Sequence, residues 1–317
     1  MLEGSVRKEG NLVRIAAQLI DAISGHHIWS KRYDRKLESI FELQDEIMRD
    51  ILIEIRAQLT EGDQVLVWHK RYQNKKVNLE AYFKQMQSRW HYFRQDREGF
   101  AMSKRLSEEA IKIDPNYYGP YVLLTYLNQR NLPLAEKYAQ KALQLDESAP
   151  MANIAMGLIY LKKRQWGKAI AMGEKALSLD PNGAEIHNHH AYFLNEAGRF
   201  EEAIPLYEKA FRLDPYPPSF YYYRLGLAYF YMGRYDDTVD ICKKGLERNP
   251  RDMFARLFLV AGYVKQGREE QARAEAKKIL EVWPDYSISR YKARSTQKDK
   301  VALNKFYDAV GKAGFPE

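Results

Sequence analysis

Four prolines recur at a nearly constant spacing in the second half of the chain. Pro181, Pro215, Pro250 and Pro284 are separated by 34, 35 and 34 residues. Similar residue types stand at similar offsets before each proline. A fixed period of this size indicates one repeated unit of supersecondary structure, which must stack on its neighbours because it cannot bury its apolar face alone. The period therefore restricts the fold more than any local pattern does.

Each repeated unit has the pattern of two helices joined by a turn, and in three of the four clear units the turn contains glycine. Gly198, Gly233 and Gly267 stand where the first helix must stop, a position that suits a left-handed C-terminal cap. Small residues in the second helix allow the two helix axes to approach closely, and an aromatic residue fills the space beside the turn. The small residues are Ala169, Ala203 and Ala272, and the aromatic residues are Trp166, Phe200 and Tyr235.

This pattern resembles the tetratricopeptide repeat, a helix-turn-helix unit of about 34 residues. Two less regular units precede the four clear ones, over about 78–115 and about 116–147. We therefore expect a mainly α-helical chain in which residues 78–284 form an α-solenoid of about six helix pairs. Residues 285–317 are expected to form a C-terminal capping helix and tail, because a solenoid must cover its last apolar face. The apolar residues of that cap are Val301, Leu303, Phe306, Tyr307 and Val310.

The first part of the chain has a different pattern. Alternating apolar residues around Gly10 predict a β-hairpin, and residues 27–34 predict a third strand. Over about 38–60, apolar residues recur every three or four positions, which predicts an amphipathic helix with Ser39 as its N-cap. Residues 61–77 are predicted to be a linker.

Residues 2–58 resemble the C-terminal half of the TolB-like domain. That domain is found beside tetratricopeptide repeats in bacterial signalling proteins, where it often follows a class III adenylate or guanylate cyclase domain. Its N-terminal half is absent here, so we expect residues 1–60 to form a partial TolB-like β-meander plus helix with a truncated start. A short sheet with an open edge is seldom stable alone. We therefore expect it to pack on the first repeat or to form a homodimer through the N-terminal strands.

The chain carries a net charge of +8, but its 50 lysines and arginines are interleaved with 42 acidic residues. The clearest basic cluster, Lys70, Arg71, Lys75 and Lys76, lies in the predicted linker, so we expect no nucleic-acid partner. A single cysteine excludes an intrachain disulfide and fits a reducing compartment. No signal-peptide pattern and no apolar run long enough for a bilayer is present, which predicts a cytoplasmic protein without a membrane span.

The sequence has no Gly-rich phosphate loop, no Cys/His spacing for zinc and no nucleophile elbow. We therefore expect no enzymatic activity, no cofactor and no metal. His187 and His190 are three apart on a predicted helix, a spacing that can bind metal. However, His190 stands at the repeat position of Leu225 and Leu259, which favours packing. Cys242 is expected to be buried rather than reactive.

The remaining candidate site is a groove. In this repeat class the first helix of each unit lines the concave face, and residues three and four apart on that helix project inward. Aromatic rings there can bury apolar side chains of a bound peptide, and asparagine amides can bond its backbone. We expect peptide contacts from Asn188, Tyr192, Asn195, Tyr223, Arg224, Leu227, Phe230, Leu257 and Lys265. The alternative is that several of these residues only pack between neighbouring units.

Two functions remain open for such a chain. The first is a non-enzymatic protein–protein interaction scaffold that binds a peptide or protein segment on its concave face. By resemblance, this would be the regulatory part of a bacterial signalling protein of the cyclase type, whose catalytic domain would lie outside these residues. The alternative is a structural module that dimerises through its N-terminal strands and spaces other domains.

Overall fold

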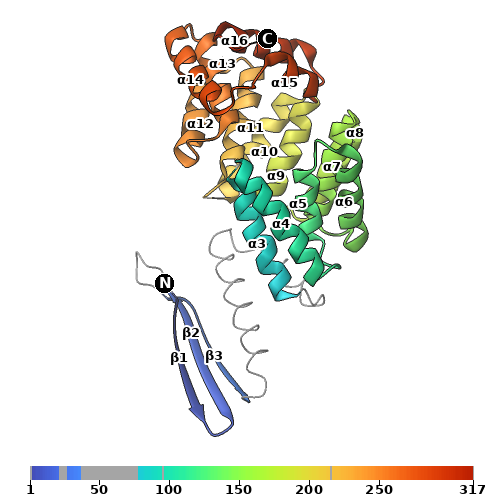
Figure 1. Ribbon diagram of the computed structural model, residues 1–317, viewed down its shortest axis with the longest axis vertical. Coiled ribbons are helices and arrows are strands. Elements are labelled where there is room, and N and C mark those ends of the chain that lie inside the picture. Colours follow the sequence, from blue (N-terminus) through green and yellow to red (C-terminus); the bar gives the residue numbers. More distant parts are fainter. Residues whose placement is uncertain (1, 21–26, 37–77, 95, 215, 317) are drawn as a thin grey trace. The chain divides into compact units, whose positions relative to one another are not determined.

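The computed structural model describes residues 2–20, 27–36, 78–94, 96–214 and 216–316. The chain divides into two compact units, Met1–Leu79 and Glu80–Glu317, and each is described by itself (Figure 1). The helix predicted over 38–60, with Ser39 as its cap, and the linker predicted over 61–77 lie outside the described residues.

The first unit contains an antiparallel sheet with the strand order β1-β2-β3. The strands are β1 Leu2–Glu9, β2 Leu12–Ile20 and β3 His27–Lys36. Gly10 has a φ of 57°, so it supplies the left-handed residue of the predicted hairpin turn. Ile15 pairs with Val6 in β1 and with Tyr33 in β3, and Val13 and Tyr33 are buried. The predicted hairpin and third strand are confirmed.

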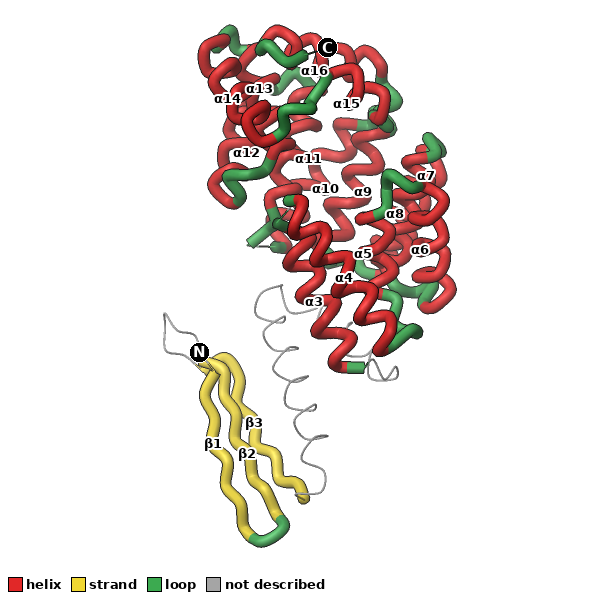
Figure 2. The backbone as a smooth tube through the Cα atoms, in the orientation of Figure 1, coloured by secondary structure: helices red, strands yellow, loops and turns green. Residues whose placement is uncertain are grey.

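The second unit is a stack of six helix pairs followed by two further helices (Figures 1 and 2). The pairs are α3 Leu79–Phe93 with α4 Arg97–Ile113, α5 Gly119–Leu127 with α6 Leu132–Leu145, α7 Pro150–Lys162 with α8 Trp166–Leu179, α9 Ala184–Glu196 with α10 Phe200–Leu213, α11 Ser219–Tyr231 with α12 Tyr235–Arg248, and α13 Met253–Lys265 with α14 Glu269–Val282. The last helices are α15 Ile288–Arg294 and α16 Lys300–Lys312. The predicted solenoid of six helix pairs is confirmed.

The glycine turns have the predicted conformation. Gly198, Gly233 and Gly267 follow α9, α11 and α13 with φ values of 82°, 77° and 74°. Only glycine adopts such a left-handed cap without strain. Ala169, Ala203 and Ala272 are completely buried, as expected for residues at the closest approach of two helices.

A recurring hydrogen bond links the repeats at four of the boundaries between helix pairs. A side chain on the first helix reaches back six residues to a backbone carbonyl at the end of the preceding unit. The bonds are Tyr121 Oη to Pro115 O at 3.1 Å, Asn153 Nδ2 to Glu147 O at 2.9 Å, His187 Nε2 with Pro181 O at 2.8 Å, and Arg256 Nη2 to Pro250 O at 2.7 Å. Four different residue types make the same contact, so residue identity alone does not reveal it.

The first helices form the inner layer of the curved stack. Helix α5 contacts α7, α7 contacts α9, α9 contacts α11 and α11 contacts α13. Successive second helices make at most weak contacts in the described residues. We call the exposed side of this inner layer the inner face.

Helix α16 does more than close the end of the stack, because it packs on α13 and α11 of the inner layer. Leu303, Phe306, Tyr307 and Val310 are buried, as predicted for the cap. Val301, however, is 66% exposed, because it stands in the first turn of α16 on the side away from the repeats. Within the described residues, every helix is too short or too polar to cross a lipid bilayer.

Candidate interaction surface

The nine residues predicted to contact a peptide lie together on α9, α11 and α13, but their exposure differs. The buried ones are Asn188 and Asn195 at 0%, Phe230 at 2%, Leu257 at 3% and Leu227 at 7% exposed. Tyr192, Tyr223 and Arg224 are half-buried, and Lys265 is exposed. The five buried side chains pack inside the helical layers, so the accessible part of the predicted surface consists of the other four.

Arg224 of α11 contacts side chains of α9 and α11 at the inner face. Its guanidinium carbon lies 4.4 Å from the centre of the Tyr192 ring and 4.7 Å from the centre of the Phe220 ring. Both contacts are within the range of cation–π attraction. Its Nη1 donates a hydrogen bond to Asn188 Oδ1 at 2.7 Å, whereas its buried Nε has no partner among the described residues. Two rings and one amide therefore hold this cation.

Three residues at or beneath the inner face are not among the predicted contacts. Arg89 of α3 donates to Glu185 of α9 at 2.9 Å, a contact between the first and the fourth helix pair. His189 stacks on Tyr126 with ring centres 5.6 Å apart, and its Nδ1 lies 3.4 Å from Arg224 Nη1. Burial, together with the nearby Arg224 and Arg89, lowers the pKa of His189 well below its usual value. The ring is therefore neutral at physiological pH and can accept a hydrogen bond from Arg224.

The sequence itself shows which residues of α9 share one side of the helix. Glu185, His189, Tyr192 and Glu196 are four, three and four positions apart, which places them on one stripe of a helix. The predicted set on this helix shares only Tyr192 with the stripe. Asn188 lies one position from it, and one position turns a side chain by about 100°.

The C-terminal segment covers the end of α9. We call residues 295–299, which join α15 to α16, the strap. Trp166 Nε1 donates to Thr296 O at 2.8 Å, and the Lys298 N–H donates to Glu196 O at 2.9 Å. The Thr296 hydroxyl donates to the Glu196 carboxylate. The strap thus lies against the third and fourth helix pairs, although it follows the sixth in sequence.

Two residues predicted to contact a peptide lie beside this segment. Gln297 Nε2 donates to the backbone oxygen of Asn195 at 2.9 Å. The Phe306 ring on α16 lies 5.5 Å from the Phe230 ring and 4.9 Å from the Phe258 ring. The chain's own C-terminal segment therefore occupies one end of the surface predicted for a partner.

A buried acid lies under the strap and interacts electrostatically with a lysine. The Glu196 side chain is among the buried charged groups, and burial raises its pKa, opposed by the Thr296 hydrogen bond and by the Lys162 charge. Burial lowers the pKa of Lys162, opposed by Glu196. Each group thus favours the charged form of the other, and burial disfavours both charges.

His187, His190 and Cys242 are buried and lie in packed or hydrogen-bonded surroundings. His187 Nε2 is bonded to a backbone carbonyl, and a Cβ added to Gly173 would overlap the His190 ring. Burial lowers the pKa of His190 to about 4, and burial raises the pKa of Cys242. In the part of the chain that the structure describes, no group of three or more His, Cys, Asp or Glu side chains is placed to hold a metal ion. His190 and Cys242 are packing residues, as their repeat positions indicate.

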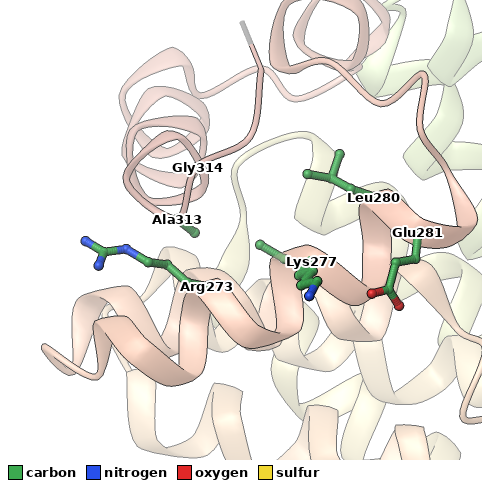
Figure 3. Close-up of a pocket in the computed structure, with 7 residues that line it drawn as sticks. Arg273, Lys277, Leu280, Glu281, Ala313 and Gly314 are labelled. Atoms are coloured by element: carbon green, nitrogen blue, oxygen red, sulfur yellow. The ribbon is translucent and has the colours of Figure 1, made fainter.

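A shallow hollow of about 460 Å³ lies between α14 and the end of the chain (Figure 3). It is lined by Arg273, Ala276, Lys277, Leu280, Glu281, Ala313 and Gly314. Arg273 forms an ion pair with Glu269 on the same helix, and the charged side chains at the rim are exposed. The hollow has the mixed charge of an ordinary surface and brings no reactive group together.

Models of the tetratricopeptide repeat match residues 124–184, 154–219 and 219–252. Solved structures of low sequence identity share the fold. The Cut9–Hcn1 hetero-tetramer of APC/C matches with a TM-score of 0.54 and 12% identity, over 81% of this chain and 48% of that chain. The human IFIT1 dimer with PPP-AAAA matches with a TM-score of 0.53 and 16% identity, over 70% of this chain and 57% of that chain.

A curated protein is similar in sequence. It is the putative adenylate cyclase 3 of Rhizobium meliloti (strain 1021), which is 34% identical over 170 residues. The alignment covers 50% of this chain and 28% of that protein. The aligned half of this chain therefore spans less than a third of the relative's length.

Proposed function

Because the chain carries tetratricopeptide repeats, a fold of protein–protein interaction scaffolds, we propose that it holds a segment of a partner protein on its inner face. The observation that carries the proposal is the row of accessible side chains on successive first helices: Tyr192, Tyr223, Arg224 and Lys265. Half-buried aromatic rings beside a cation can bury apolar side chains of a partner while the cation bonds its backbone oxygens or carboxylates.

We further propose that the scaffold is a non-catalytic regulatory part of a signalling protein of the cyclase type. The similarity to a putative adenylate cyclase supports this context. Catalysis in such a protein would come from a domain outside the present residues, and the partner segment would link the scaffold to that domain or to its regulator. The proposal on the inner face does not depend on this context.

Site-specific photo-crosslinking tests the inner face directly. Benzoylphenylalanine replaces Tyr223 on the inner face or, as a matched aromatic control, Tyr216, which is 68% exposed between α10 and α11. We expect position 223 to give a discrete protein adduct in cells that position 216 does not give. Arg224→Ala in the same chain should reduce that adduct. Identical products from both positions would contradict the proposal.

A second function is favoured by one feature of the first unit. Val6 in β1 is 68% exposed and Leu12 in β2 is 59% exposed, and β1 is an outer strand of the described sheet. We propose as the alternative that this edge pairs with a second copy, which would make the chain an assembly module. Sedimentation over a wide concentration range should then show a dimer that Val6→Lys weakens. A monomer at every concentration would exclude this function.

A further inference from the structure

The strap, residues 295–299, contacts the repeats as a bound peptide would. Its backbone takes part on both sides, because Thr296 O accepts from Trp166 and the Lys298 N–H donates to Glu196 O. Its side chains add further bonds from Thr296 to the Glu196 carboxylate and from Gln297 to a backbone oxygen. Main-chain bonds combined with side-chain contacts are the usual means by which proteins recognise extended segments.

The surface under the strap differs from the equivalent places in the next two repeats. The last carbonyls of a helix lack intrahelical partners, and the strap supplies donors to two of them at the end of α9. A Cβ added to Gly198, in the turn after α9, would lie 3.5 Å from Asp299 Cβ. At Gly233 and Gly267, in the turns after α11 and α13, nothing lies within 4 Å. The strap therefore covers the first of these three turns and leaves the other two uncovered.

The two central strap residues are polar and buried. Thr296 is 6% exposed and Gln297 is 1% exposed. A buried polar side chain is costly unless it is hydrogen-bonded, so the site under the strap selects for a hydroxyl and an amide in these two positions. The acceptors that impose this selection are the Glu196 carboxylate and the backbone oxygen of Asn195.

We propose that Trp166, Asn195 and Glu196 form a binding site for an extended Thr-Gln segment, and that the strap is the internal occupant of this site. A segment of the same chemistry from a partner protein displaces the strap and takes its hydrogen bonds. This inference rests on the proposed function and adds to it the chemistry of the partner. An internal segment competes at an effective concentration of about 1 mM, so displacement requires the partner to engage the inner face as well.

Peptide binding to the full chain tests the proposal. The probe is a fluorescein-labelled peptide with the sequence of residues 291–303, titrated into the wild-type chain and into the double variant Thr296→Val/Gln297→Ala. The variant keeps the site but weakens the binding of the strap to it. We therefore expect fluorescence anisotropy to show that the peptide binds the variant at least about tenfold more tightly than it binds the wild-type chain. The same peptide with alanine at the Gln297 position is the matched control and should not bind. Adding Trp166→Phe to the double variant should weaken binding again.

Equal affinity for the two chains, with unchanged helix content of the variant, would overturn the proposal. Hydrogen exchange on the wild-type chain gives a test that needs no variant. If the strap leaves its site transiently, the Lys298 N–H should exchange faster than the central amides of α9. Exchange of these amides at the same rate would show that the strap is a fixed part of the fold. Crosslinks from position 223 without peptide binding would refute this inference alone. Peptide binding without those crosslinks would refute the wider proposal for the inner face.

Discussion

Glycine-to-alanine changes at three positions separate backbone strain from steric overlap. Gly233 has a φ of 77°, and nothing lies within 4 Å of an added Cβ, so the change there affects only the backbone. A left-handed conformation costs an L-residue about 1–2 kcal/mol, and the stiffer unfolded chain returns about 0.4–1 kcal/mol. We expect Gly233→Ala to lower the free energy of unfolding by about 1 kcal/mol.

Gly167 is the matched control. It is the second residue of α8, its φ is not left-handed, and nothing lies within 4 Å of an added Cβ. Alanine is better than glycine in a helix by up to about 1 kcal/mol, so Gly167→Ala should stabilise the protein. At Gly226 a Cβ would lie 2.6 Å from Cys242 Sγ, and overpacking of a core typically costs about 1–3 kcal/mol. Gly226→Ala should therefore be destabilising without any left-handed strain.

Equilibrium urea unfolding followed by far-UV circular dichroism measures all three variants. Gly167→Ala and Gly233→Ala should change the free energy of unfolding with opposite signs, although both changes add one methyl group in open space. A Gly233→Ala chain as stable as the wild type would refute the assignment of this turn as a strained left-handed cap. An equally stable Gly226→Ala chain would show that α11 and α12 can move apart without cost.

Three further predictions concern the contacts across the inner face. Trp166→Phe keeps an aromatic ring but removes the indole N–H that donates to Thr296 O, which should cost about 1 kcal/mol and speed hydrogen exchange in the strap. Unchanged exchange would show that this bond does not hold the strap. Burial raises the pKa of Glu196, so the folded state binds the carboxyl proton more tightly than the unfolded state does. Stability should therefore fall as the pH rises from the pKa of Glu196 in the unfolded state to its higher pKa in the folded state. Glu196→Gln should flatten that part of the pH profile in thermal melts, and an unaltered profile would exclude Glu196 as its source. Glu185→Gln removes the partner of Arg89, and the pair is only partly buried, at 28% and 22% side-chain exposure. We therefore expect the free energy of unfolding to fall by about 1–2 kcal/mol, and by less at high salt. Urea unfolding at two salt concentrations measures this loss, and a loss independent of salt would contradict an electrostatic origin.

The periodic features of the fold were predictable from the sequence. The helix pairs, the left-handed glycines and the buried alanines all recur at a fixed offset, and each has one local physical reason. Ala203 and Gly198, for example, stand where any unit of this kind needs a small residue and a left-handed residue. The three-stranded sheet was predictable from alternation and from Gly10 for the same kind of reason.

The accessible surface was harder to predict, because it depends on contacts between residues far apart in the sequence. The Arg89–Glu185 contact depends on the curvature of the whole stack, which is the sum of small rotations between pairs. The strap has no periodicity, so nothing local indicated that Gln297 would lie against α9. On α9 itself, Asn188 and Asn195 each lie one position before His189 and Glu196, and all four side chains are buried.

The contact between α3 and α9 changes how the stack should unfold. In a simple solenoid each unit touches only its neighbours, so the ends can fray while the middle stays folded. Here Arg89 joins the first pair to the fourth, and Trp166 holds a segment that follows the sixth pair against the third. Loss of either end therefore removes stabilising contacts from the centre of the array. The six pairs should melt in one cooperative transition, and a destabilising change in α3 should lower the stability of helices as far away as α11.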